Sequence, residues 1–205
     1  VSGNAIGLKA GFGDLLIVNG FAVFGDDLIV SKKATASDGK RLYRINTSDT
    51  TASNWYVKLL SVNNCSQSCN TIETAFNNIF FCDDSGFKSL KGVQEYGDLS
   101  VDQTGERINS MFTGNDCDEV KFIPKYNCIF FAVADRIFVY SEKNGRGRFT
   151  DFLPVQGRIR SFCQAGDIVY WGGNDGYLYK MDASVATDAT SPMVSSNFVN
   201  YARTK

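Results

Sequence analysis

The chain has 205 residues, of which 43% are hydrophobic and 21% are charged. These values are typical of folded globular proteins and exclude a largely disordered, collagen-like or coiled-coil chain. The 21 Lys and Arg residues nearly balance the 22 Asp and Glu residues, which gives a net charge of -1. Such a balance argues against a dedicated binder of nucleic acid or of anionic membranes, although a local basic patch stays open.

The sequence contains no histidine. Histidine is the usual general base near neutral pH and a common ligand of transition metals, so Ser-His-Asp sites, Cys-His sites and imidazole-dependent zinc sites are excluded. We therefore expect no enzymatic activity, no catalytic residue, no cofactor and no metal. The acidic cluster Asp116, Asp118 and Glu119 lacks the spacing of a calcium loop, and we interpret it as a solvated turn.

Six cysteines are spread thinly along the chain. We expect free structural thiols, while a disulfide or a metal half-site at Cys65 and Cys69 stays open. Apolar runs all fall short of a membrane helix, so we expect no membrane insertion by this chain. Because the sequence begins with Val1 rather than Met, we expect it to be part of a longer protein.

Runs of β-branched and aromatic residues alternate with turn signals along most of the chain, which is the pattern of strands and hairpins. A turn or a short helix is expected at 71–77 and at 100–112. In chain order, strands are expected at 15–18, 21–24, 28–30, 42–45, 55–60, 79–82, 87–90, 128–133, 137–140, 168–171 and 177–181.

Glycine corners preceded by Asp, Asn or Ser recur between the apolar arms, at Gly39, Gly86, Gly145 and Gly176. Such corners favour tight hairpin turns, in which residues adopt positive φ. The loosely repeated unit predicts a mainly β fold, a propeller-like array of antiparallel hairpins, with an irregular β-sandwich as the alternative. We expect one domain at 1–182 and a C-terminal arm or exit strand at 183–205.

Two stretches combine an apolar strand, a glycine corner and a second aromatic strand in the same order. The first is 79–90 with 96–102 and 107–109, and the second is 122–127 with 129–131, 137–140, 145–149 and 168–182. This order resembles the tail nozzle, tail tubular and DNA-stabilisation proteins of short-tailed bacteriophages. Where that family commonly has Trp before an Arg-Phe-Thr element, this chain has Gly147.

The resemblance implies a structural virion protein of the phage tail, made in the host cytoplasm. It would form a ring of identical subunits with other tail or portal proteins and would touch genomic DNA transiently in the ejection channel. A basic run between 142 and 160, opposed only by Glu142 and Asp151, supplies the candidate DNA contacts, with a solvated hairpin as the alternative. Its members are Lys143, Arg146, Arg148, Arg158 and Arg160.

An alternative function is a carbohydrate- or receptor-binding module on the virion. Aromatic side chains stack on sugar rings when they gather on one exposed face, whereas packing inside the protein is their more common role. The residues that would form such a face are Trp55, Tyr56, Trp171 and Tyr177.

Overall fold

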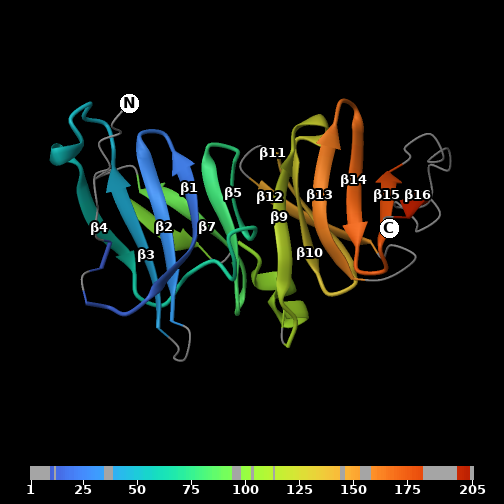
Figure 1. Ribbon diagram of the computed structural model, residues 1–205, viewed down its shortest axis with the longest axis horizontal. Coiled ribbons are helices and arrows are strands. Elements are labelled where there is room, and N and C mark those ends of the chain that lie inside the picture. The colour runs from blue at the N-terminus through green and yellow to red at the C-terminus, as the bar shows by residue number, and fades with distance from the viewer. Residues whose placement is uncertain are drawn as a thin grey trace. The chain divides into compact units, whose positions relative to one another are not determined.

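The computed structural model describes residues 10–11, 13–34, 39–93, 98–102, 104–112, 114–143, 146–152, 158–181 and 198–203. These residues form sixteen strands in four antiparallel sheets of four strands, and their only helices are three 3-10 segments. The prediction of a mainly β chain built from antiparallel hairpins is confirmed. Figure 1 colours the strands by their position in the chain, from blue near the N-terminus to red near the C-terminus.

The chain divides into two compact units, which we describe separately. The first comprises Val1–Asp83 and Lys88–Gln103, and the second comprises Asp84–Phe87 and Thr104–Lys205. Parts of the predicted pattern lie outside the described residues, namely Tyr96, Gly97, Gly145, Asp182 and most of the predicted arm, 183–197.

The first unit contains two sheets in which each strand pairs with the next. One 3-10 segment, η1 (Ala52–Asn54), precedes the last strand of the first sheet. The strands of the first sheet are β1 (Ile17–Phe24), β2 (Asp27–Lys33), β3 (Lys40–Asn46) and β4 (Tyr56–Ser61). Those of the second are β5 (Ile72–Ala75), β6 (Asn78–Asp83), β7 (Gly86–Val93) and β8 (Asp98–Asp102).

Side chains from both sheets form the core of the first unit. Successive residues of a strand point to opposite faces, so Ile29 packs on one face while its neighbours Leu28 and Val30 lie on the other. The core contains Ala22, Ile29, Leu42, Ile72, Ile79, Phe81 and Leu90. The predicted turn or short helix at 71–77 is instead strand β5 followed by a turn at Phe76 and Asn77, both of which have positive φ.

The second unit also contains two antiparallel sheets. Their orders are β12-β11-β10-β9 and β13-β14-β15-β16, and two 3-10 segments, η2 (Glu106–Phe112) and η3 (Pro124–Tyr126), belong to this unit. The strands are β9 (Cys117–Ile123), β10 (Cys128–Val133), β11 (Arg136–Lys143), β12 (Arg146–Phe152), β13 (Ile159–Ala165), β14 (Ile168–Gly173), β15 (Tyr177–Met181) and β16 (Phe198–Arg203).

Aromatic rings fill the second unit. Trp171 and Tyr179 stack with ring centroids 5.4 Å apart in the core between the two sheets. Phe131, on the other face of β10, stacks on Phe87 at 4.5 Å and on Phe138 at 5.3 Å. Rings at these separations stabilise the packing beyond the area that they bury.

The sheets pack in the same way in both units. The first strand of one sheet lies beside the first strand of the next, β1 beside β5 and β9 beside β13. This arrangement is consistent with a propeller-like array and with the sandwich alternative, and no sheet of described residues is closed. In the described part of the chain, no helix has the length and apolar character needed to cross a membrane.

Candidate functional site

The first sheet carries an apolar face opposite the core of the first unit. Residues paired across antiparallel strands share a face, so the strand register identifies its members. Two cross-strand rows run over all four strands. One row is Val23, Leu28, Ile45 and Val57, and the other is Phe21, Val30, Tyr43 and Leu59. We call these eight residues the open face.

The side chains at both edges of the open face are exposed. Phe21 is 66% exposed and Val23 is 60% exposed on β1, while Leu59 is 45% exposed on β4. In contrast, Ile29 and Leu42, which point to the opposite side of the same sheet, are completely buried. The sheet is thus apolar on both faces, as expected for a sheet that is covered on both sides. The middle of the open face is itself buried, because Val30, Tyr43 and Ile45 pack with Ala10 and Trp55, so only its two edges are exposed.

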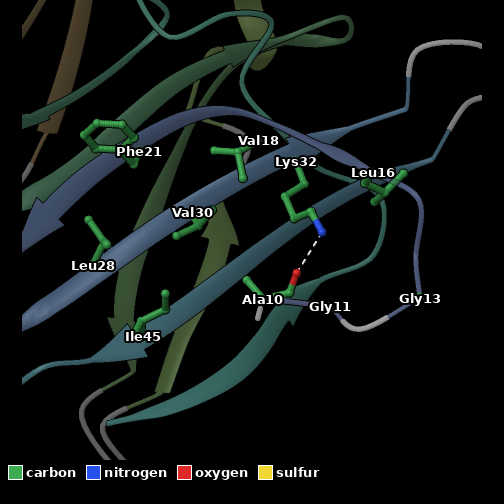
Figure 2. A pocket seen from close by; sticks show the side chains of 10 residues that line it. All are labelled: Ala10, Gly11, Gly13, Leu16, Val18, Phe21, Leu28, Val30, Lys32 and Ile45. Atoms are coloured by element: carbon green, nitrogen blue, oxygen red, sulfur yellow. Dashed lines mark hydrogen bonds between the residues drawn. The ribbon is translucent and has the colours of Figure 1, made fainter. Parts of the chain in front are cut away.

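A groove of about 530 Å³ lies on the β1 and β2 side of this face. Figure 2 shows Val30 and Ile45 on neighbouring strands and Phe21 on β1, with Gly11 and Gly13 on the adjoining loop. Lys32 is the one charged side chain among the described residues that line it. The groove therefore suits an apolar side chain.

A polar cluster fixes residues 10–11 and 13–16 to the end of the groove. Lys32 Nζ donates to Asp14 Oδ1 at 2.6 Å and to the carbonyl oxygen of Ala10 at 2.7 Å, the second of which is drawn in Figure 2. The Tyr43 hydroxyl donates to Asp14 Oδ2 at 2.9 Å, and the Leu16 N–H donates to Asp14 Oδ1 at 3.2 Å. The Asp14 carboxylate thus receives donors from two strands and from its own loop.

These contacts control the protonation of the cluster. Burial alone would raise the pKa of Asp14, but the hydrogen bonds from Lys32, Leu16 and Tyr43 outweigh it and hold that pKa below its ordinary value. Burial, together with the hydrogen bond to Asp14, raises the pKa of Tyr43. At neutral pH the carboxylate is ionised beside the Lys32 ammonium, so the pair adds no net charge to the groove.

The structure divides the predicted basic run into two sets on different sheets. Lys143 ends β11 and pairs in register with Arg146 on β12. Arg146 and Arg148 are exposed on that edge strand, and among the described residues no ion pair involves either of them. Arg158 instead immediately precedes β13, and Arg160 lies on β13, in the next sheet.

The second set is bound to an acidic residue. Arg158 donates from Nε to Asp118 Oδ2 at 2.5 Å and from Nη2 to Asp118 Oδ1 at 3.1 Å, while Arg160 Nη1 donates to Oδ1 at 2.7 Å. The hydrogen bond to Asp118 raises the pKa of Arg158. Since their guanidinium groups share one carboxylate, these two arginines are less available to an external phosphate than Arg146 and Arg148.

The interpretation of the acidic cluster as a solvated turn is wrong for Asp118 and Glu119. Both belong to β9, and the Glu119 carboxylate accepts a hydrogen bond from the N–H of Phe162 on the neighbouring β13. The partners lie about forty residues further along the chain, so local spacing could not reveal them. The described residues contain no cluster of acidic or cysteine side chains suited to a metal ion.

The four aromatic residues considered for sugar binding lie in different environments. Trp171 is buried in the second unit, whereas Tyr56 is 54% exposed at the start of β4 in the first unit. Trp55 is half-buried, and its indole N–H donates to the carbonyl oxygen of Asp49 at 2.6 Å. Tyr177 is half-buried beside Tyr179. Two of the four residues thus belong to the first unit and two to the second.

Sequence reasoning missed the open face and its polar cluster. The available signal was the run Leu28-Ile29-Val30, in which consecutive residues are apolar, because such a run is typical of a strand buried on both faces. The sequence does not show which of the two faces packs against other parts of the chain.

No protein-family model and no curated protein matches the chain. A crystal structure of a protein from Lactobacillus plantarum is similar, with a TM-score of 0.57 and 12% sequence identity. The match covers 90% of this chain and 54% of that chain, so this chain spans about half the length of the structure that it matches. At this identity the similarity shows the fold alone.

This finding corrects the predicted relationship to tail proteins of short-tailed phages. The similar solved structure is a bacterial protein, and no phage tail family matches. The physical reason for the error lies in the turns: Gly86 and Gly176 have positive φ between paired strands, as tight antiparallel hairpins require. Apolar strands joined by glycine corners therefore indicate a hairpin and do not identify a protein family. What this chain shows is a β-sheet fold with an open apolar face.

Proposed function

We propose that this chain is a non-catalytic structural module that acts by protein assembly, with the open face of the first sheet as its contact surface. The observation that carries the proposal is the exposure of Phe21, Val23 and Leu59 at the edges of a face whose middle is buried. Neighbouring exposed apolar side chains such as Phe21 and Val23 are typical of a protein contact site, because leaving them in water is unfavourable.

The chemistry around the groove supports assembly rather than catalysis. The Asp14 carboxylate is occupied by three donors, and its lowered pKa makes it a weak base at neutral pH. The raised pKa of Tyr43 keeps the phenol protonated. General acid-base catalysis needs groups whose pKa lies near the working pH. The cluster instead positions the loop that forms one end of the groove.

The virion location, the portal partners and the ring of subunits around DNA were predicted from the phage resemblance. With the resemblance overturned, the phage tail is not part of the proposal. Self-association, which the sequence analysis also expected, remains compatible with the open face.

Photo-crosslinking tests the proposed assembly. The photoreactive residue p-benzoylphenylalanine replaces Phe21 in one variant and Met111 in a control variant, because Met111 is also an exposed apolar residue, at 41%, but lies on η2. We expect illumination to crosslink the variant with the photoreactive residue at position 21 more efficiently than the control variant. The crosslinked partner is either another copy of the chain or a different protein from its native cell. Equal or absent crosslinking at position 21 contradicts assembly through the open face.

The exposure of Arg146 and Arg148 favours contact with DNA phosphates as a second candidate. Each phosphate contact contributes about 0.9 to the slope of log affinity against log salt for duplex DNA. Replacing both arginines by glutamine is therefore expected to lower that slope by about 1.8 in fluorescence anisotropy titrations. The matched control replaces Arg158 and Arg160, which Asp118 already binds. Equal effects of the two double substitutions contradict this candidate.

A further inference from the structure

We infer that the outer edge of β12 binds an acidic segment of another protein as a further strand, which extends the sheet β12-β11-β10-β9. This inference goes beyond the proposed function, because β12 lies in the second unit and contributes no residue to the open face. β12 is the last strand of its sheet, and no described strand pairs with its outer side. An edge of this kind presents a row of backbone donors and acceptors to an incoming strand.

Three cations lie on one face of the β11-β12 hairpin. In the strand register Lys143 pairs with Arg146 and Ser141 pairs with Arg148, and alternate residues of a strand share a face. All three cations are exposed, and no ion pair between described residues involves any of them. Like charges directly opposite each other destabilise a strand pair. This face therefore favours a ligand that brings negative charge.

The two acidic residues of the same hairpin lie on its other face. Glu142 pairs in register with Gly147, and its carboxylate accepts a hydrogen bond from the Tyr140 hydroxyl at 3.4 Å. Asp151 binds Arg136 at 2.7 Å. Since both acids point away from the three cations, the cationic face of the hairpin contains no acidic residue of its own.

Aromatic packing on that other face holds β12 in place. Gly147 lets the ring of Tyr140 lie against the strand, because a Cβ at position 147 would come within 2.5 Å of that ring. Phe149 packs on Tyr140 with ring centroids 5.1 Å apart and on Phe131 at 6.3 Å. The strand is therefore already ordered before a partner binds, which lowers the entropic cost of binding.

The charge of the edge determines which strand it binds. Lys and Arg on an edge strand discourage pairing with apolar strands and with strands of the same charge. Arg146 and Arg148 are two residues apart and share a face, so a partner with Asp or Glu at alternate positions places one carboxylate beside each guanidinium group. Opposite charges paired across strands stabilise the pairing. The partner is thus an extended segment with alternating acidic residues.

The same features favour a peptide over a nucleic acid. A peptide strand uses both the backbone groups of β12 and its cations, whereas a chain of phosphates uses the cations alone. Proteins that bind single-stranded nucleic acid also offer aromatic side chains for stacking, but Tyr140 and Phe149 pack on the opposite face of the hairpin. A net charge of -1 provides no long-range attraction for DNA.

Fluorescence anisotropy with labelled peptides tests this inference. The probe is a short peptide in which glutamate alternates with valine, and the control peptide has the same composition with its glutamates in one block. We expect tighter binding of the alternating peptide. Replacing Arg146 and Arg148 by glutamine should weaken that binding about 2- to 30-fold, as the loss of two opposite-charge pairs does. Replacing Arg158 and Arg160, which Asp118 already binds, should leave it unchanged.

A third peptide tests the role of the backbone. N-methylation at alternate positions of the probe removes the donors that face β12, and we expect it to abolish binding, because strand addition depends on backbone hydrogen bonds. Circular dichroism verifies that the variants are folded, as expected because Arg146 and Arg148 are exposed.

Strand addition at β12 is overturned if the alternating peptide does not bind, if it binds no better than the blocked peptide, or if binding survives N-methylation. It is also overturned if duplex DNA binds through Arg146 and Arg148 while the peptides do not, and these residues are then phosphate contacts. None of these outcomes involves Phe21, so assembly through the open face stands or fails independently.

Discussion

Truncating one apolar residue on each face of the first sheet should have very different effects on stability. Ile29 is fully buried in the core, so Ile29→Ala removes buried methyl and methylene groups and leaves a cavity. Such a change costs about 2–5 kcal/mol. Phe21 is 66% exposed, so Phe21→Ala removes only about a third of the burial that a core phenylalanine has. Since full burial contributes about 1.5–3 kcal/mol, the expected loss is about 1 kcal/mol or less.

Urea unfolding monitored by tryptophan fluorescence measures this difference. The chain has two tryptophans, and Trp55 packs beside Tyr43 and Ile45 in the first unit, whereas Trp171 lies in the second. A Trp171→Phe background therefore restricts the signal to the first unit, where both substitutions lie. The protein is kept dilute, because association through the open face would add to the apparent stability. Equal losses for Phe21→Ala and Ile29→Ala would refute the exposure of Phe21 at the edge of the open face.

Three further outcomes test other parts of the structure. Iodoacetamide should modify the exposed Cys69 and Cys163 first, while Cys128, whose pKa burial raises to about 12, stays unmodified in the folded protein by mass spectrometry. Folding lowers the pKa of Asp14, so this residue stabilises the folded protein at pH values above its ordinary pKa of 3.8. The stabilisation is lost as the pH falls through the pKa of the folded state. Asp14→Asn should therefore reduce the loss of stability that the protein shows when the pH is lowered. Asp118→Asn should cost about 1–2 kcal/mol in chemical unfolding, because it weakens the hydrogen bonds to two arginines that are partly exposed. Early alkylation would contradict the burial of Cys128. An unchanged dependence of stability on acid pH would contradict the contacts of Asp14, and unaltered stability of the Asp118 variant would contradict its contacts with the two arginines.

The hairpins could be predicted from the sequence because their signals are local. Strand β10 is a run of apolar and aromatic residues, and its pairing with β11 follows from the short turn at Ala134, which has positive φ. The glycine corner at Gly86 likewise separates β6 from β7. Strand β9 was not predicted, because its acidic residues suggested a solvated turn. Its Asp118 is satisfied by arginines of a different sheet, a long-range contact that local patterns do not contain.

The open face could not be predicted for a related reason. The apolar run at Leu28-Ile29-Val30 indicates a strand with two apolar faces, but covering a face depends on which other strands pack there. The candidate DNA contacts illustrate the same limit. All five basic residues share one stretch of sequence, yet the fold places Arg146 on one sheet and Arg160 on another, where Asp118 binds it. The resemblance to phage proteins used hairpin signals that many antiparallel folds share.

Covalent footprinting of side chains by a photoactivated carbene tests the exposed edge of the open face, because it measures the accessibility of each residue in solution. In dilute protein, we expect strong labelling of Phe21 and Val23 and protection of Ile29 and Leu42. Labelling of Phe21 as weak as that of Ile29 would show that this edge is covered and would contradict assembly through the open face.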